Sequence, residues 1–182
     1  MQTIVETDRL RLRAFKETDL DDLFRLVSDP EVMRFSIDGP HTREMTSTRL
    51  TAMILMQETC GYSPFPCFKK PDDEFIGYCG LQALAIEGRQ EIEITYRMAT
   101  AHWGIGYATE AARACRDHAF ETLKKQRVVS VIDPNNVGSV KVAERIGMTN
   151  ERTISFKNIE ADLYSVKSSA IHRDPRRNSE KR

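Results

Sequence analysis

A short glycine turn, Gly104-x-Gly106, lies between a strand-like segment that ends at Met98 and a helical pattern that starts at Glu110. Glycines let a backbone approach a ligand closely, and the free N–H groups at the start of a helix point toward negative charge. The turn therefore predicts an anion site, although an ordinary tight connection can have the same pattern. The residues of this predicted site are Trp103, Gly104, Ile105, Gly106, Tyr107, Ala108 and Thr109.

Three phosphate-bearing ligands could use such a turn. ATP in a P-loop needs a Gly-Lys-Ser/Thr ending, which the sequence lacks here. A dinucleotide needs a third small residue where Thr109 stands, and an acid about 20 positions later, near Lys124 and Gln126, where there is none. These mismatches weigh against an ordinary nucleotide-binding protein. The third ligand is the pyrophosphate of coenzyme A.

The elements that must position this turn follow from hydrophobic periodicity. Residues 91–98 alternate apolar and polar, which predicts a strand with Glu93, Thr95 and Arg97 on one face. A helix is expected from residue 110 to about 124, then a buried strand over 128–132. A second helix opens at Asn136-x-x-Ser139 and stops at Gly147.

The rest of the chain predicts strands near 9–14, 75–81, 152–157 and 161–167. Thr18 and Asp21 suggest a weak capping box for a first helix that ends before Pro30, and Thr42 is a candidate cap for a second. Prolines at 64, 66 and 71 allow only a short, irregular strand between them. In the first strand, we expect the arginines at 9, 11 and 13 to share one face, with solvent exposure as the simplest role of that face.

Composition bounds the class of protein. The chain has 182 residues, 40% of them hydrophobic, and its 27 Lys and Arg balance 27 Asp and Glu, which excludes the bulk charge of a general nucleic-acid binder. No run approaches the ~18 apolar residues of a membrane span, and the N-terminus lacks an apolar signal stretch. The scattered cysteines and histidines favour reduced thiols and no metal. We expect one cytoplasmic domain over 1–170 and a disordered basic tail over 171–182.

The sum of these features resembles the GNAT superfamily of acetyl-CoA-dependent N-acetyltransferases. The stretch from Trp103 to Ala111 is similar to the acetyl-CoA loop of its Rim-type branch, typified by ribosomal-protein N-terminal acetyltransferases. Asn136-x-x-Ser139, with Glu144 to Met148, resembles the second cofactor motif, and Thr7 to Arg13 resembles the start of that branch. The resemblance implies an α+β (mixed α/β) fold: a mostly antiparallel twisted sheet of six to seven strands, with a splayed parallel pair and flanking helices.

The resemblance also implies direct attack of an amine on the thioester of acetyl-CoA. Glu93 is the best candidate to accept the proton of the amine, with Glu91 as a rival and solvation as an alternative role. Backbone N–H groups near Tyr96, Arg97 and Met98 would stabilise the thioester oxygen and pair with the pantetheine arm.

Protonation of the leaving sulfur has fewer candidates. Many relatives have a tyrosine where this chain has Ala143, so Ser139 could donate a hydrogen bond to the sulfur instead. Asn136 would contact pantetheine, cap its helix, or both. Trp103 replaces a Gln or Arg of the general family pattern, which leaves backbone N–H groups as the main phosphate donors. His102 and Cys115 are weaker candidates for a base and an acyl carrier.

The predicted function is transfer of an acetyl group from acetyl-CoA to a primary amine, either a protein N-terminal α-amine or a small molecule. A non-catalytic acyl-CoA-binding or sensing module is the alternative. The expected partner is the amine acceptor, with no nucleic acid and no membrane, and the chain would be a monomer or a homodimer. The segment over 30–70, where the resemblance is thinnest, leaves the acceptor open.

Overall fold

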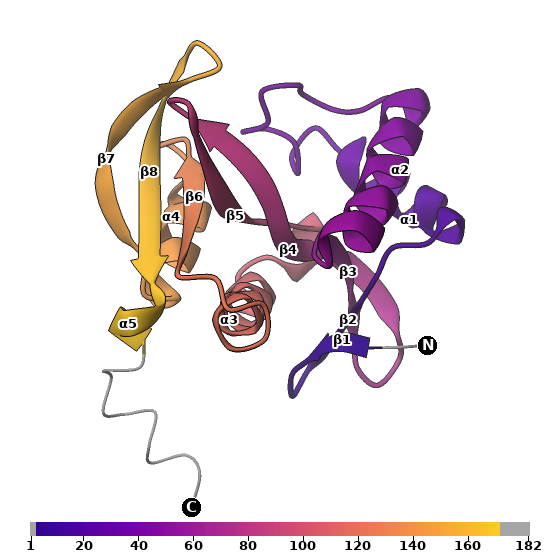
Figure 1. Ribbon diagram of the computed structural model, residues 1–182. Coiled ribbons are helices and arrows are strands. Elements are labelled where there is room, and N and C mark those ends of the chain that lie inside the picture. Colours follow the sequence, from indigo (N-terminus) through magenta and orange to yellow (C-terminus); the bar gives the residue numbers. More distant parts are fainter. Residues whose placement is uncertain (1–2, 172–182) are drawn as a thin grey trace, which may run out of the picture.

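The structure is a computed structural model that describes residues 3–171 (Figure 1). Residues 172–182, almost all of the predicted tail, lie outside this range, and Ile171 ends α5. Within 3–171, no helix is long and apolar enough to cross a membrane. The helices and strands, in chain order, are β1 (Thr3–Glu6), β2 (Leu10–Arg13), η1 (Glu17–Asp19), α1 (Leu20–Val27), α2 (Arg43–Cys60), β3 (Pro64–Lys69), β4 (Glu74–Ile86), β5 (Arg89–Met98), η2 (Thr100–His102), α3 (Tyr107–Glu121), β6 (Arg127–Ile132), α4 (Val137–Arg145), β7 (Thr149–Phe156), β8 (Ile159–Lys167) and α5 (Ser168–Ile171).

The described strands form one sheet in the order β1-β2-β3-β4-β5-β6-β8-β7. Strands β5 and β6 are parallel, and the other neighbours are antiparallel. This confirms the mixed α/β fold with a parallel pair, but the sheet has eight strands instead of six to seven. The additional strand is β1, in which Ile4 and Val5 are adjacent, so its residues show no two-residue period.

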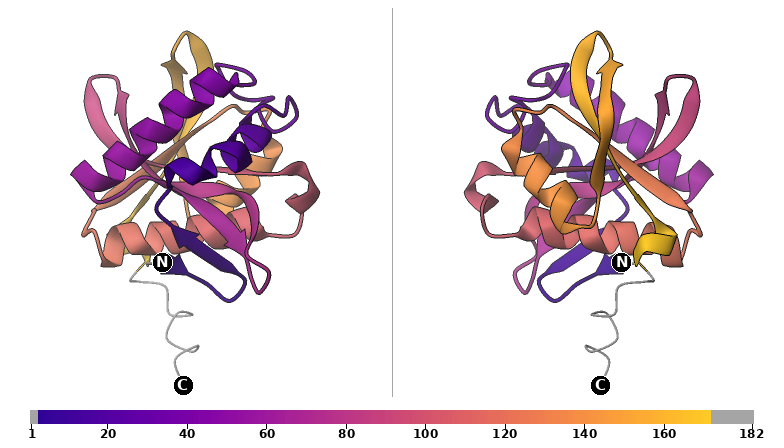
Figure 2. Two further views of the ribbon diagram at one scale, coloured as in Figure 1. Left: turned by 90° about the vertical axis from the view of Figure 1, so that its right-hand side faces the viewer. Right: turned by 90° about the vertical axis from the view of Figure 1, so that its left-hand side faces the viewer.

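Helices cover both faces of the sheet. Helices α1 and α2 pack with Tyr78 of β4 in one apolar cluster, whereas α3 packs against Cys79 and Leu81, which point to the opposite face. Figure 2 shows α1 and α2 on one side of the molecule, and α4 with the β7–β8 hairpin on the other. Helix α3 starts at Tyr107 and not at 110, because Gly106 takes the left-handed conformation at its N-cap.

Two prolines fit into β3 because this strand has a partner on only one side there. Pro64 and Pro66 lie opposite Gly80 and Tyr78 of β4, whereas β2 pairs only with Cys67 to Lys69. A proline cannot donate to a ladder, so both prolines occupy the part of β3 that β2 does not reach. The strand also shifts register after Cys67, which confirms the prediction of a short, irregular strand.

The predicted capping box at Thr18 and Asp21 is wrong, and its failure has a physical cause. Asp19 accepts the backbone N–H of Lys16 at 2.8 Å and forms a buried ion pair with Arg13 at 2.7 Å. Asp19 thereby holds the start of η1, whose N-cap residue is Lys16 and not Thr18. The arginine face of the first strand is not uniformly solvated either, because Arg13 is buried. By contrast, Thr42 caps α2 as predicted, accepting the N–H of Met45 at 3.2 Å.

The parallel pair is short. Strands β5 and β6 share one registered pair, Glu93 with Val129, and then separate. Strand β6 continues against β8 through six pairs, so it keeps its ladder on the other side. The separation leaves an opening in the middle of the sheet, between the carboxyl ends of two parallel strands, where ligands commonly bind in α/β proteins.

Two glycines of the central hairpin test whether close backbone packing holds β3 against β4. A Cβ on Gly80 would lie 2.2 Å from the Ser63 carbonyl oxygen, whereas one on Gly88 would meet nothing within 4 Å and would only strain a backbone with φ of +77°. We expect Gly80→Ala to lower the free energy of unfolding by about 3 kcal/mol or more through overpacking. Gly88→Ala should cost about 1 kcal/mol. Urea unfolding measures both, and equal losses would contradict this packing.

Candidate active site

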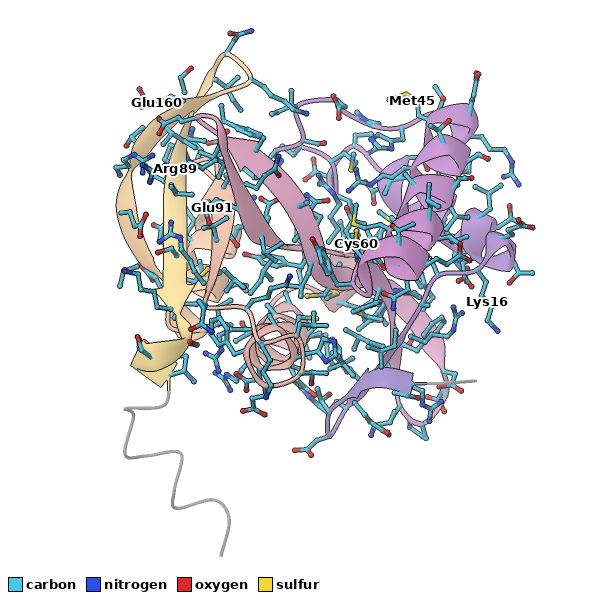
Figure 3. The ribbon with its side chains drawn as sticks, viewed as in Figure 1. Lys16, Met45, Cys60, Arg89, Glu91 and Glu160 are labelled. Carbon is cyan, nitrogen blue, oxygen red and sulfur yellow. The ribbon has the colours of Figure 1, made fainter. Side chains whose placement is uncertain are left out.

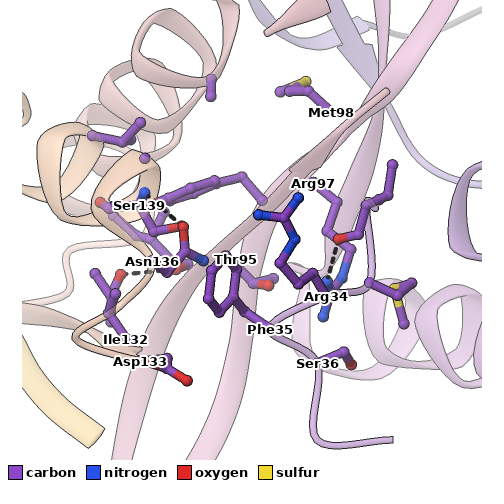
Figure 4. A pocket seen from close by; sticks show the side chains of 18 of the residues that line it. Arg34, Phe35, Ser36, Thr95, Arg97, Met98, Ile132, Asp133, Asn136 and Ser139 are labelled. Carbon is purple, nitrogen blue, oxygen red and sulfur yellow. Dashed lines mark hydrogen bonds between the residues drawn. The ribbon is translucent and has the colours of Figure 1, made fainter. Parts of the chain in front are cut away.

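The opening between β5 and β6 is part of a cavity of about 700 Å³ that runs across the sheet (Figure 4). Its walls come from the loop before α2, from β4 and β5, from the glycine turn, and from the start of α4. In Figure 4, Asn136 and Ser139 lie on one side of Thr95, and Arg97 lies on the other. The cavity therefore has one half beside α3 and α4 and another half beside α1 and α2.

The glycine turn leaves the start of α3 uncapped. Gly104 and Gly106 have φ of +75° and +92°, and Gly106, the N-cap residue, has no side chain to bind the first N–H groups. The N–H groups of Tyr107, Ala108 and Thr109 are therefore available to an anion, with the favourable end of the helix dipole behind them. Of the seven predicted turn residues, six line the cavity; Ile105 does not.

Residues from the start of the chain fix the turn from behind. Arg9 forms an ion pair with Glu110 at 2.5 Å, donates to the Ile105 carbonyl at 3.3 Å, and lies over the ring of Tyr107. Thr7 donates to the same Glu110 carboxylate at 2.6 Å. These hydrogen bonds outweigh the effect of burial and lower the pKa of Glu110, so the pair stays charged. The motif at the start of β2 thus holds the turn in shape.

Trp103 links the turn to β5. Its indole N–H donates to the Met98 carbonyl at 2.7 Å, and about half of the side chain stays exposed. The indole N–H is therefore engaged within the protein, which agrees with the prediction that backbone groups are the main phosphate donors here.

The backbone of β5 presents alternate residues to the opening. Ala99 donates its N–H to Ile76 of β4, and Ser130 of β6 donates its hydroxyl to the Ile94 carbonyl at 2.9 Å. Because lateral directions alternate along a strand, Tyr96 and Met98 direct their backbone groups toward the opening. The Arg97 carbonyl instead points at β4, where a Cβ on Gly77 would lie 2.1 Å from it. Of the three predicted backbone positions, Arg97 thus lines the site with its side chain.

Glu93 lies where the two parallel strands separate. Its carboxylate accepts from Gln82 Nε2 at 2.6 Å and from the backbone N–H of Val131 at 3.3 Å. Val131 lies on β6 beyond the single registered pair, so the side chain of Glu93 satisfies an N–H that faces the opening. Burial raises the pKa of Glu93, and the hydrogen bonds from Gln82 and Val131 counteract part of that rise.

Glu91, the rival acid, lies elsewhere. It accepts from Arg127 at 3.3 Å and does not line the cavity. Figure 3 shows it at the side of β5 that faces β6 and β8. Arg127 also binds Glu151, so Glu91 belongs to a charge cluster at the end of the sheet. The strand pattern placed both glutamates on one face, but in the structure only Glu93 lines the cavity, whereas Glu91 pairs with Arg127 outside it.

The start of α4 forms the facing wall. Asn136 caps the helix by accepting the Ser139 N–H at 3.1 Å, so one of its two predicted roles is confirmed. The Tyr96 hydroxyl donates to the Ser139 carbonyl at 3.0 Å, which ties β5 to α4, and burial raises the pKa of Tyr96 so that this hydroxyl stays protonated. The side chain of Ala143 is fully buried below.

The two weaker candidates have other surroundings. His102 lines the cavity, but its Nε2 lies 3.3 Å from the Glu74 carboxylate and its ring packs edge-on against Tyr107, so its contacts are with β4 and the glycine turn. Cys115 is buried inside α3 and does not line the cavity. Among residues 3–171, no group of three or more metal-ligating side chains is placed to hold a metal ion.

Several cavity residues were not predicted from the sequence. Gln82 lies directly opposite Glu93 in the β4–β5 hairpin, and Tyr78 lies opposite Arg97. A two-residue turn at Glu87 and Gly88 fixes this register, so the turn signal could have identified Gln82. His41 and Arg49 also line the cavity, but they come from the loop before α2 and from α2 itself, and no motif marks them.

Comparisons with known proteins agree with this geometry. The family model described as an acetyltransferase (GNAT) domain matches residues 9–149. The uncharacterized protein YkkB of Bacillus subtilis is 37% identical over 168 residues, covering 92% of this chain and 97% of that protein. An uncharacterized N-acetyltransferase of Bacillus licheniformis is 32% identical and covers 83% of this chain and 84% of its own length.

A solved structure extends the comparison to the fold. An acetyltransferase from Agrobacterium tumefaciens has a TM-score of 0.80 and 28% identity, covering 92% of this chain and 95% of that one. Together with the match over residues 9–149, this likeness covers the glycine turn, β5, β6 and α4. The chain belongs to the GNAT family of acetyltransferases, enzymes whose acyl donor is acetyl-CoA.

Proposed function

We propose that this enzyme transfers the acetyl group to a primary amine, a protein N-terminal α-amine or the amine of a small molecule, by direct attack within a ternary complex. The observation that carries the proposal is the position of Glu93. Its carboxylate lies at the separation of β5 and β6, in the same cavity as the uncapped start of α3. A proton acceptor and an anion site thus face one continuous space.

The first role of the chain is to take a proton. An ammonium group has no lone pair, so the acceptor must lose a proton before its nitrogen attacks the thioester carbon. Glu93 accepts this proton, directly or through a water molecule, and its raised pKa makes it a better base than an exposed glutamate. The C–N bond forms, the C–S bond breaks, and the sulfur keeps the electron pair.

The second role is to hold the thioester. The backbone N–H and carbonyl of Tyr96 and the N–H of Met98 are suited to pair with the pantetheine arm as an added strand would, and the N–H groups are suited to donate to the thioester oxygen. The N–H groups of the glycine turn bind the pyrophosphate. Asn136 contributes from the facing wall, where its side chain lines the cavity as well as capping α4.

The third role concerns the leaving sulfur. Ser139 lines the cavity at the start of α4, and its hydroxyl can donate a hydrogen bond to the sulfur. No tyrosine can act from position 143, where the chain has alanine. A dedicated acid is not essential, since a thiol pKa of about 8.5 makes the thiolate a tolerable leaving group near neutral pH.

Proteins of the same fold differ in their acceptors. One is RimL, a ribosomal alpha-N-protein acetyltransferase in complex with coenzyme A, at 21% identity. Another is aminoglycoside acetyltransferase AAC(6')-Ib in complex with coenzyme A, at 18% identity. These identities support the shared fold alone. The resemblance of the glycine turn to the Rim-type loop favours the first kind of acceptor, and the residues of the cavity half beside α1 and α2 bear on the choice.

Glu93→Gln tests the proton acceptor. We expect kcat to fall about 100-fold or more, because an amide cannot take the proton, while the KM for acetyl-CoA changes less than about twofold. The matched control is Glu91→Gln, two residues away on β5 and outside the cavity, for which kcat should stay within about twofold of wild type. Release of coenzyme A, followed with a thiol reagent, measures both. Unchanged kcat in Glu93→Gln would refute the assignment.

The pH dependence of kcat/KM provides a second test. Glu93 accepts a proton only when ionised, so activity should fall as the pH drops through its pKa. Because burial raises that pKa, the fall should begin above the ordinary glutamate value of about 4.3. The remaining activity of Glu93→Gln should lack this acid limb and keep only the rise that deprotonation of the free amine produces. An identical acid limb in the variant would assign the base to another group.

Arg9→Met tests whether the start of β2 supports the glycine turn. Loss of the pairing with Glu110 should let the turn relax and raise the KM for acetyl-CoA about five- to tenfold, with little change in kcat. Arg11→Met is the matched control, since Arg11 lies two residues away and pairs with Asp73 outside the cavity. Equal KM values for the two variants would show that the pairing does not shape the site.

A further inference from the structure

Two arginines meet at one buried tyrosine in the half of the cavity that faces α1 and α2. Tyr78 is fully buried, and its hydroxyl accepts from Arg97 Nε at 2.9 Å. The guanidinium of Arg49, on α2, lies over the same ring, 6.0 Å from its centre. Both arginines line the cavity. Tyr78 therefore brings two cationic groups from different elements to one wall.

Neither arginine has an anionic partner within the described part of the chain. Arg97 makes a second hydrogen bond, to the Val32 carbonyl at 3.3 Å, and no ion pair joins Arg49 or Arg97 to a carboxylate. Arg34, which lines the same cavity, is paired with Glu31. A guanidinium fork is suited to bind a carboxylate or phosphoryl group through two parallel hydrogen bonds.

The same wall contains the buried side-chain polar atoms that lack a partner. Among residues 3–171 these are two, His41 Nδ1 and Arg49 Nε. Buried polar atoms are nearly always hydrogen-bonded in folded proteins, so two unpartnered ones beside a cavity indicate where a polar ligand completes the site. Burial, together with the charges of Arg49 and Arg97, lowers the pKa of His41, so its imidazole is neutral at neutral pH and can donate or accept.

The acidic groups that face this wall have other roles. Glu93 is hydrogen-bonded to Gln82 and Val131 and is the proposed base. Asp38 also lines the cavity, where it is exposed, and its charge acts to raise the pKa of His41 without forming an ion pair. On β5, the face that carries Glu93 also carries Arg97, four residues later, so their Cα atoms are about 13 Å apart. Thr95 lies between them on the same face and also lines the cavity, so a small molecule that reaches from Glu93 to Arg97 would lie over Thr95.

We propose that the acceptor is a small amine that carries an anionic group, a carboxylate or a phosphoryl group, within a few bonds of the reacting nitrogen. Arg49 and Arg97 bind the anion, and the amine faces Glu93. This inference rests on the proposed function, whose acceptor it defines. A polycationic acceptor would bring further positive charge against two unpaired guanidinium groups, and this repulsion would select against it.

The experiment compares matched acceptors with the full chain. α-Amino acids, their carboxamides and the corresponding 1-aminoalkylphosphonates are assayed for release of coenzyme A, alongside peptides with neutral side chains. We expect kcat/KM at least tenfold higher for acids or phosphonates than for the carboxamides, which keep the amine but lose the anion. Comparison of the amino acids with the aminoalkylphosphonates shows whether the site prefers a carboxylate or a phosphoryl group. Carboxamides or peptides that react as well as the acids would overturn the inference and leave the proposed function standing.

Substitution of Arg49 separates anion binding from an effect on Glu93. Arg49→Gln should lower kcat/KM at least tenfold for the acids and less than twofold for the carboxamides, and Arg49→Lys should restore part of the loss. Arg34→Gln is the control, because Arg34 lines the cavity but is already paired. An equal loss for acids and carboxamides, with a shifted acid limb of the pH profile, would show that Arg49 only adjusts the base and would overturn the inference.

A binding measurement does not depend on turnover. Calorimetry on the chain saturated with coenzyme A should show the preferred acid or phosphonate binding at least tenfold more tightly than its carboxamide, and Arg49→Gln should abolish the difference. Equal affinities would overturn the inference. Tight, Arg49-dependent binding without release of coenzyme A from acetyl-CoA would support the anion site and refute the proposed function instead.

Discussion

The site depends on the separation of two parallel strands after one registered pair. A parallel strand pair normally forms a continuous ladder, and each N–H left out of it needs another acceptor. Here Glu93 supplies one, because its carboxylate binds the Val131 N–H of β6 while Gln82 holds it from β4. The same side chain that satisfies the opened sheet is thereby placed at the start of the cavity. Glu93 thus has a structural role, as the acceptor of the Val131 N–H, and the proposed role of base in the reaction.

Other elements keep this opening usable. Trp103 ties the glycine turn to the end of β5, and Arg9 holds the turn through Glu110. On the facing wall, the Tyr96 hydroxyl fixes the first turn of α4. Two of these contacts bear on β5, and the third joins α3 to the segment before β2. The half of the cavity that we propose binds acetyl-CoA is therefore shaped in advance of binding, which lowers the cost of ordering the ligand.

Local sequence patterns predicted the elements around the cavity half beside α3 and α4. The glycine turn, the alternating strand and the Asn136 cap each depend on residues that are close together in the sequence. The half of the cavity beside α1 and α2, where we propose that the acceptor binds, was not predictable in the same way. Arg49 and Arg97 share a wall only because α2 packs over Tyr78, and no spacing in the sequence reports that contact. Buried Arg13 was missed for the same reason, since its role depends on its ion pair with Asp19. Gln82 is intermediate, because the hairpin turn fixes its register opposite Glu93.

The decisive measurement is a crystal structure of the chain with coenzyme A and an unreactive acceptor analogue. We expect the pyrophosphate to lie against the N–H groups of residues 104–109, pantetheine to pair with Tyr96 and Met98 between β5 and β6, and the sulfur to lie on the side of the cavity that holds Glu93. Two results would contradict this expectation: coenzyme A bound elsewhere, or a continuous β5–β6 ladder in which the Val131 N–H donates to the backbone of β5.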